Sequence, residues 1–215
     1  MINYIILTLC ILFSAQSSYS NNADTTFSKS INQNSNIYFF NINVFRNQYS
    51  NTHYFVNIFK DSSNNLIQTI NDSTEGDFNF QYPEFSIEFI DINFDGNLDL
   101  KLYDFASADG QNFAFKYWLY NNETGKFIYN ENYSYKLAGM EVYIDSSINM
   151  IIVSFISGDY AMGQDRYKVI DNELLLYEEE GIFYDITKEA HFERLYRNVN
   201  GEMIIITEKP FSFKE

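Results

Sequence analysis

Cysteine and histidine are scarce in this chain of 215 residues. Cys10 is the only cysteine, which excludes a disulfide within the chain and any site built from several thiolates. His53 and His191 are the only histidines, and neither lies in a pattern typical of a catalytic base or a metal ligand. The sequence also lacks a glycine-rich phosphate loop, a serine nucleophile elbow, a CxxC pair and an HExxH motif. We therefore expect a protein that is not an enzyme.

Positive charge is scarce as well. Lys and Arg together number 14 against 29 Asp and Glu, which gives a formal net charge of −15. Nucleic acids and anionic membranes bind basic surfaces, so both are disfavoured as partners. A cationic protein partner, or metal cations, would be attracted instead. An acidic surface also keeps an exported protein soluble, so the charge by itself does not select a partner.

The first twenty residues have the architecture of a secretory signal peptide. They carry no charged side chain, and an apolar run from Tyr4 to Phe13 is followed by small and polar residues. This run is shorter than the roughly 20 residues that a membrane-spanning helix needs. We therefore expect residues 1–20 to be cleaved and the protein to be secreted or periplasmic, without a membrane span. The alternative is a lipoprotein in which Cys10 carries the lipid.

Residues 21–36 are rich in Asn, Ser and Thr, so the sequence predicts a flexible tether there. A single domain is expected over residues 37–215, because about 195 residues after cleavage is a usual size for one domain. Within it, aromatic and β-branched residues occur in short runs separated by Asn, Asp, Ser and Gly. Such runs are typical of many short strands.

Alternating apolar and polar residues predict a strand over residues 85–89 and another over 98–102, joined by a turn that contains Asp-Gly. Further hairpins are predicted over residues 113–129, 166–177 and 192–207. Recurring hairpins favour an all-β fold, with antiparallel hairpins in a small propeller-like arrangement. A β-sandwich is the alternative, because strand patterns do not distinguish the two kinds of packing.

Three further segments have distinctive patterns. Residues 150–156 form an apolar run that predicts a strand buried on both faces. Trp118 has the most apolar surface to bury, and we expect it to be enclosed within its strand. Residues 185–197 are compatible with a helical turn.

A calcium-binding pattern occupies the loop from Asp91 to Asp99. Oxygen-bearing side chains stand at positions 1, 3, 5 and 9 of this loop, namely Asp91, Asn93, Asp95 and Asp99. Calcium takes about six to eight hard oxygen ligands, and donors at every second residue of a tight loop can supply them. The backbone carbonyl of Asn97 would add the ligand at position 7, and Gly96 at position 6 permits the sharp turn. The alternative is an Asx-rich Asp-Gly turn that needs no metal.

An EF-hand is excluded, because it would require a glutamate at position 12, where Leu102 stands, and helices on both sides. The block from Asp91 to Leu102, followed by Tyr117–Asn121 and Thr124–Phe127, instead resembles the calcium loops of FG-GAP and VCBS-type β-repeats. It is similar to a family of small periplasmic bacterial calcium proteins. This family includes immunity proteins against lysozyme-like, peptidoglycan-cleaving toxins that are delivered by type IV secretion.

The resemblance implies a secreted, calcium-stabilised inhibitor or immunity protein that blocks a peptidoglycan-cleaving hydrolase. Its partner would be a cationic protein such as a cell-wall hydrolase, which an acidic surface would attract. The alternative function is a calcium-dependent glycan-binding or cell-wall-binding module without catalytic activity. An aromatic content of 19% is compatible with sugar stacking, although alternating aromatics in strands usually fill cores.

Two polar segments, residues 104–112 and 157–165, interrupt the predicted strands and are expected to be long loops. Loops of compact domains often carry function. In the second segment, Tyr160 is a candidate aromatic anchor for a partner, and Asp159 and Asp165 would face a basic cleft rim. The alternative is an ordinary connection in which Tyr160 folds back on the sheet.

Overall fold

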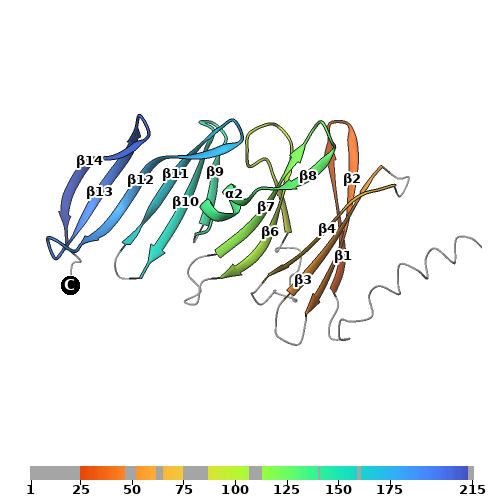
Figure 1. Ribbon diagram of the computed structural model, residues 1–215, viewed down its shortest axis with the longest axis horizontal. Helices are drawn as coiled ribbons and strands as arrows, with labels where there is room; N and C mark the ends of the chain where they lie inside the picture. The colour runs from red at the N-terminus through yellow and green to blue at the C-terminus, as the bar shows by residue number, and fades with distance from the viewer. Residues whose placement is uncertain are drawn as a thin grey trace, which may run out of the picture. The chain divides into compact units, whose positions relative to one another are not determined.

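The computed structural model describes residues 25–46, 52–61, 65–74, 87–106, 113–139, 141–158 and 161–212. Over these ranges the chain is almost entirely strand, and the strands form three sheets (Figure 1). The strand order within each sheet follows the order along the chain, and consecutive strands pair antiparallel. The prediction of an all-β fold built from antiparallel hairpins is therefore confirmed.

The chain divides into two compact units. Unit 1 comprises residues 1–32 and 36–83, and unit 2 comprises residues 33–35 and 84–215. The four-stranded sheet of the N-terminal part consists of β1 (Thr25–Gln33), β2 (Asn36–Arg46), β3 (Thr52–Lys60) and β4 (Asn65–Thr74). A four-stranded meander of this kind has the architecture of one blade of a β-propeller.

Alternation in sequence gives this first sheet one buried face. Tyr38, Phe40, Ile42 and Val44 of β2 are at most 1% exposed, while the residues between them are more exposed. Opposite them on β3 stand the buried residues Tyr54, Val56 and Ile58, with Phe40 paired to Ile58 and Ile42 to Val56. Opposite residues of an antiparallel pair point to the same face, so these rows form one apolar layer.

The predicted tether over residues 21–36 does not hold for Thr25–Gln33, which form β1. The polar residues that suggested a tether instead make cross-strand hydrogen bonds. Thr26 Oγ1 lies 3.0 Å from Asn43 Oδ1, and Ser28 Oγ lies 2.8 Å from Asn41 Oδ1. The low hydrophobicity of this segment therefore reflects the exposed face of a strand, which polar cross-strand pairs stabilise. The predicted signal peptide over residues 1–20 lies outside the described residues.

Unit 2 holds a four-stranded and a six-stranded sheet. The first consists of β5 (Ile87–Ile90), β6 (Asp99–Ala106), β7 (Phe113–Asn121) and β8 (Lys126–Tyr129). The second consists of β9 (Glu141–Asp145), β10 (Met150–Ser157), β11 (Ala161–Ile170), β12 (Glu173–Asp185), β13 (Ala190–Val199) and β14 (Glu202–Phe211). The predicted hairpins over residues 113–129, 166–177 and 192–207 are confirmed. At the turn between β11 and β12, Asp171 and Asn172 adopt φ values of 51° and 61°, as a two-residue hairpin turn requires.

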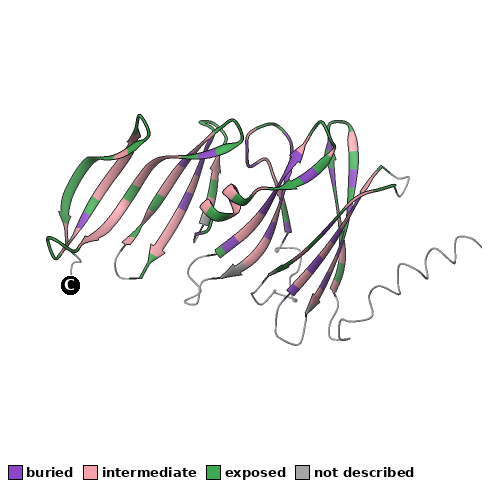
Figure 2. Cartoon of the chain, viewed as in Figure 1, coloured by how far each residue is buried: buried purple, intermediate pink, exposed green. Residues whose placement is uncertain are grey.

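The core of unit 2 draws on both of its sheets (Figure 2). It contains Ile92, Tyr117, Leu119, Tyr133, Leu137, Ile151, Val153, Tyr167 and Leu174. Strand β7 is buried on both faces, because Tyr117, Trp118, Leu119 and Tyr120 are all at most 9% exposed. The expectation that Trp118 is enclosed is therefore confirmed. Strand β10 is less buried than predicted, since Ile152, Phe155 and Ile156 are only partly covered.

The helix of unit 2 lies where the sequence predicts none. Helix α2 (Glu131–Lys136) begins at Asn130, whose side chain accepts a hydrogen bond from the N–H of Tyr133 at 3.1 Å. Residues 185–197 hold the end of β12 and most of β13 instead of a helical turn. There Asp185 pairs with Arg194 across the hairpin. No helix in the described ranges is long and apolar enough to cross a membrane.

Candidate metal centre

The loop with the calcium pattern connects β5 to β6, and Ile90 pairs with Asp99 at its base. The loop is flanked by strands and not by the helices of an EF-hand, as the sequence predicts. Two residues of the loop adopt left-handed backbone conformations, Phe94 with a φ of 61° and Gly96 with a φ of 83°. Glycine enters this region without steric cost, so Gly96 serves the sharp turn that the sequence predicts.

The polar side chains of the loop bind its own backbone. The Asp91 carboxylate accepts hydrogen bonds from the N–H groups of Asp95 and Gly96, both at 3.0 Å. Asn93 Oδ1 accepts a bond from the same Asp95 N–H at 3.2 Å, and Asp95 Oδ1 accepts one from the N–H of Asn97 at 2.8 Å. The side chains at positions 1, 3 and 5 are therefore gathered on the inner side of one loop. This arrangement also agrees with the alternative of an Asx-rich turn.

Asp99 is fully buried at the base of the loop. Its Oδ1 accepts a hydrogen bond from the N–H of Tyr120 at 2.7 Å, and its Oδ2 accepts one from the N–H of Ile92 at 3.1 Å. Burial is the main cause that raises the pKa of this carboxyl to about 7, and the charges of Asp95 and Asp91 add to it. Within the described residues, no Lys or Arg forms an ion pair with these three aspartates. Three carboxylates thus share one loop without a cationic side chain.

The donor chemistry of this loop fits calcium. All five predicted ligands, Asp91, Asn93, Asp95, the carbonyl of Asn97 and Asp99, offer hard oxygen atoms of the kind that calcium prefers. A carboxylate oxygen that accepts one hydrogen bond keeps a second lone pair for a cation. In the described part of the chain, however, no three His, Cys, Asp or Glu side chains converge as a ligand cluster. Instead, the side-chain oxygens of Asp91, Asn93 and Asp95 accept hydrogen bonds from N–H groups of the loop.

Three residues that the sequence analysis did not single out lie beside the loop: Gln33, Asn34 and Asn172, and the last accepts a hydrogen bond from Asn93 Nδ2 at 3.1 Å. Gln33 Oε1 accepts a hydrogen bond from the N–H of Leu98 at 2.7 Å. Asn34 Nδ2 donates to Asn97 Oδ1 at 2.8 Å and to Asn122 Oδ1 at 2.7 Å. Residues 33–35 belong to unit 2 although they fall within the predicted tether. No local pattern points to them, because each is more than 60 positions away from the loop residue that it contacts.

Of the three candidate partner residues, the structure describes Asp165. Tyr160 and Asp159 lie outside the described residues. The segment over residues 157–165 is mostly strand, because Ser157 pairs with Ala161 at the end of the β10–β11 hairpin. Asp165 lies within β11, paired to Val153 and to Glu179, so the prediction of a loop position for Asp165 is wrong. In the other segment, Asp104 lies within β6 and residues 107–112 are outside the described ranges.

Asp165 and Glu179 form a pair of like charges on adjacent strands. The hydroxyl of Tyr167 donates to Asp165 Oδ2 at 3.1 Å, while the buried Asp165 Oδ1 has no hydrogen-bond partner. Burial raises the pKa of both carboxyls, and the charge of Asp165 further raises the pKa of Glu179. Like charges directly opposite each other in a sheet destabilise it.

Replacing Asp165 by asparagine should therefore stabilise the protein at neutral pH, by about 0.2–1 kcal/mol. Because folding raises these pKa values, the folded chain binds more protons than the unfolded chain. The free energy of unfolding therefore falls as the pH rises from the pKa values of the unfolded chain to those of the folded chain. Asp165→Asn should therefore lose less stability than wild type as the pH rises. Scanning calorimetry between about pH 4 and pH 8 measures it, with the exposed Glu202→Gln as control. A variant that melts below wild type at neutral pH would contradict the like-charge interpretation.

Comparison with known proteins gives a fold but no family. No family model matches the chain, and no curated protein matches it. Its fold is similar to the solved structure of a Xanthomonas type IV secretion system related protein, with a TM-score of 0.56. The two chains are 16% identical, and the match covers 84% of this chain and 93% of the other. At this level of identity the likeness shows the fold alone, and it extends over most of both proteins.

Proposed function

We propose that this chain is a secreted, calcium-stabilised inhibitor of a peptidoglycan-cleaving hydrolase, an immunity protein without catalytic activity. The observation that carries the proposal is the fold likeness to a type IV secretion system related protein, which covers 84% of this chain. The resemblance of residues 87–127 to immunity proteins against type IV-secreted hydrolases supports it independently. Fold alone does not fix function, so the two arguments are needed together.

The proposed calcium ion would be held by Asp91, Asn93, Asp95, the Asn97 carbonyl and Asp99. It would supply the positive charge that the three carboxylates lack among the described side chains. An ion that binds the folded chain and not the unfolded chain raises the free energy of unfolding. The role of the ion is therefore structural: it fixes the connection between β5 and β6.

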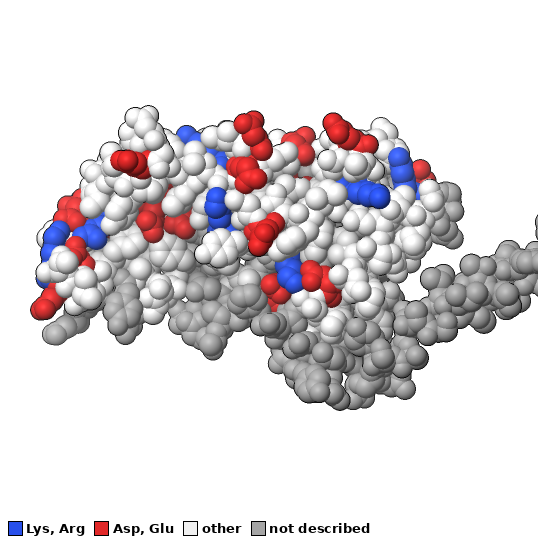
Figure 3. All heavy atoms as spheres, viewed as in Figure 1, with Lys and Arg blue, Asp and Glu red and all other residues white. Residues whose placement is uncertain are grey.

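The acidic character of the chain favours a basic partner. The sequence pI is about 4.4, and a chain with this excess of carboxylates attracts a cationic hydrolase over long range. On the face seen in Figure 3, acidic and basic side chains are interspersed. The charge therefore speeds the encounter, and a local surface must provide the specific contact.

The alternative glycan-binding module loses its best candidate. A sugar-stacking platform requires an exposed aromatic face, but Trp118 is only 6% exposed and packs against Tyr129 with ring centroids 5.3 Å apart. Trp118 is therefore no sugar platform, whereas Tyr135 and Tyr143 are exposed, and it is the fold likeness that makes the inhibitor the function that we favour.

Complex formation tests the proposal. The chain from residue 21 onward, loaded with calcium, is mixed with a cationic lysozyme-like hydrolase and run on size-exclusion chromatography. We expect one complex to elute ahead of both components. Purified peptidoglycan serves as the second bait: retention on peptidoglycan without any complex with the hydrolase would contradict the inhibitor and favour the glycan module.

A further inference from the structure

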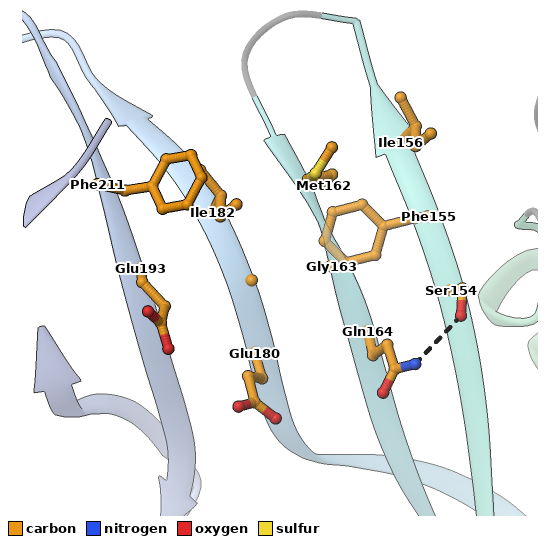
Figure 4. A pocket seen from close by; sticks show the side chains of 11 residues that line it. Ser154, Phe155, Ile156, Met162, Gly163, Gln164, Glu180, Ile182, Glu193 and Phe211 are labelled. Atoms are coloured by element: carbon orange, nitrogen blue, oxygen red, sulfur yellow. Dashed lines mark hydrogen bonds between the residues drawn. The ribbon is translucent and has the colours of Figure 1, made fainter. Parts of the chain in front are cut away.

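A groove of about 440 Å³ lies on the six-stranded sheet of unit 2 (Figure 4). One row across the strands joins Ile156 of β10, Met162 of β11, Ile182 of β12 and Glu193 of β13. Since opposite residues in antiparallel strands point to the same face, this row presents three apolar side chains and one carboxylate together. Phe211 of β14 also lines the groove.

A second row places polar groups beside the first. It joins Ser154, Gln164 and Glu180, two residues along each strand from the apolar row, so it lies on the same face. Ser154 and Gln164 are hydrogen-bonded to each other at 3.4 Å. The charged side chains that line the groove are Glu180 and Glu193, which are 49% and 50% exposed. The lining is therefore apolar in part, and its charge is negative.

Between the two rows, Gly163 and Gly181 stand directly opposite each other. A Cβ atom on Gly163 would lie 2.3 Å from the carbonyl oxygen of Glu180, and one on Gly181 would lie 2.3 Å from that of Met162. The two strands approach too closely for any side chain there. Positions 163 and 181 alternate with the two rows, so side chains there would lie on the opposite face of the sheet, and the close approach of β11 and β12 by itself explains the two glycines.

We propose that this groove is a contact surface for the hydrolase, and that it receives a lysine or arginine side chain of that cationic partner. The proposal rests on the proposed function. The aliphatic stem of the basic side chain would lie on Ile156, Met162 and Ile182, and its charged head would reach Glu180 or Glu193. Methionine adapts its shape to a partner, which suits Met162 at 41% exposure to this role.

The carboxylates of the groove are available for such a partner. Glu180 pairs with Arg166 at 2.9 Å, but Arg166 also has Glu178 at 3.8 Å. Lys209 lies 3.8 Å from Glu193 and is itself 69% exposed. Exposed ion pairs of this kind are weak, so a cation from the partner can replace them.

Binding of calcium-loaded chain to the hydrolase, measured by interferometry at low and high salt, tests the groove. We expect the double variant Glu180→Gln/Glu193→Gln to bind at least about 10-fold more weakly and with less salt dependence. Met162→Lys places in the groove a positive charge that repels the partner's basic side chain. This variant should bind about 100-fold more weakly at an unchanged melting temperature. The control Glu189→Gln/Glu202→Gln removes the same total charge from exposed sites.

If both groove variants bind as tightly as this control, the groove proposal is overturned while the proposed function stands. If wild type does not bind the hydrolase at all, the proposed function fails and the groove proposal fails with it. A circular dichroism melt of each variant ensures that weaker binding reflects the surface and not unfolding.

A different observation carries a second proposal: we infer that Gln33 and Asn34 are positioning residues for the calcium loop. Gln33 binds the N–H of Leu98, next to the Asn97 carbonyl that would be a ligand, and Asn34 holds the side chain of Asn97. Gln33 is 5% exposed, so its truncation would leave the N–H of Leu98 without a partner. Partners of this kind around a metal site orient its ligands.

Calcium titration followed by the melting temperature tests this second proposal. Gln33→Ala and Asn34→Gly should each weaken calcium binding at least about 10-fold, with Gln68→Ala of β4 as the matched control. Glycine is chosen at position 34 because Asn34 has a φ of 49°. Unchanged calcium affinity in both variants would overturn the positioning role. A wild type that does not respond to calcium would overturn the metal site itself and this role together.

Discussion

Trp118→Ala should lower the free energy of unfolding by about 3–5 kcal/mol, which would make it among the most damaging single truncations in unit 2. Trp118 is 6% exposed on a strand that is buried on both faces. It stands opposite Leu100 of β6 and Tyr129 of β8. Truncation would therefore open a cavity between three strands that cannot close without moving the sheet.

Urea denaturation followed by far-ultraviolet circular dichroism measures this loss. Trp118 is the only tryptophan, so its fluorescence is not available in the variant. Tyr135→Ala is the matched control, because Tyr135 is an aromatic residue at 83% exposure. We expect the control to change stability by less than about 0.5 kcal/mol. Equal costs for the two substitutions would show that Trp118 is not part of the core.

Asp95→Ala should abolish the stabilisation of the chain by calcium. With calcium at 100 times its dissociation constant, wild type should gain about 2.7 kcal/mol in free energy of unfolding. Calcium modules outside the cell commonly bind with dissociation constants of about 10⁻⁴ to 10⁻³ M, so about 10–100 mM calcium is needed to reach 100 times that constant. Asp95 is a proposed ligand and also accepts two hydrogen bonds from Asn97, from its N–H and from its Nδ2.

Calorimetry with calcium and with chelator measures this effect in wild type, Asp95→Ala and a control. Asp61→Asn is the control, because Asp61 is an exposed residue that directly follows β3 and lies outside the loop. The metal assignment fails if calcium leaves the melting temperature of wild type unmoved. It fails equally if Asp95→Ala responds as strongly as wild type does.

Features with local causes could be predicted from the sequence. The strands on either side of the Asp91–Asp99 loop follow from alternation, and Leu100 and Leu102 are buried as that alternation requires. The turn at Asp171-Asn172 and the hairpin at Asn121–Gly125 follow from residues that accept left-handed or tight backbone conformations. The inward side chains of Asp91, Asn93 and Asp95 follow from their spacing.

Features with distant causes could not be predicted. Thr25–Gln33 lacks the apolar alternation of a strand, and cross-strand polar pairs to Asn41 and Asn43 stabilise it. Helix α2 is too short to show helical periodicity, and only its N-cap at Asn130 is a local signal. The polar residues and glycines around Asp165 predict a loop, yet Gly163 allows β11 and β12 to approach closely. Tertiary context decided each of these positions.

The most direct test of the proposed inhibitor is a titration of lytic activity. Increasing amounts of the calcium-loaded chain are added to a fixed amount of the same cationic lysozyme-like hydrolase, and the clearing of a peptidoglycan suspension is followed. We predict that activity falls in proportion to added chain and ends near one equivalent, with Met162→Lys requiring a large excess. Undiminished lysis at an excess of folded, calcium-loaded chain would contradict the account.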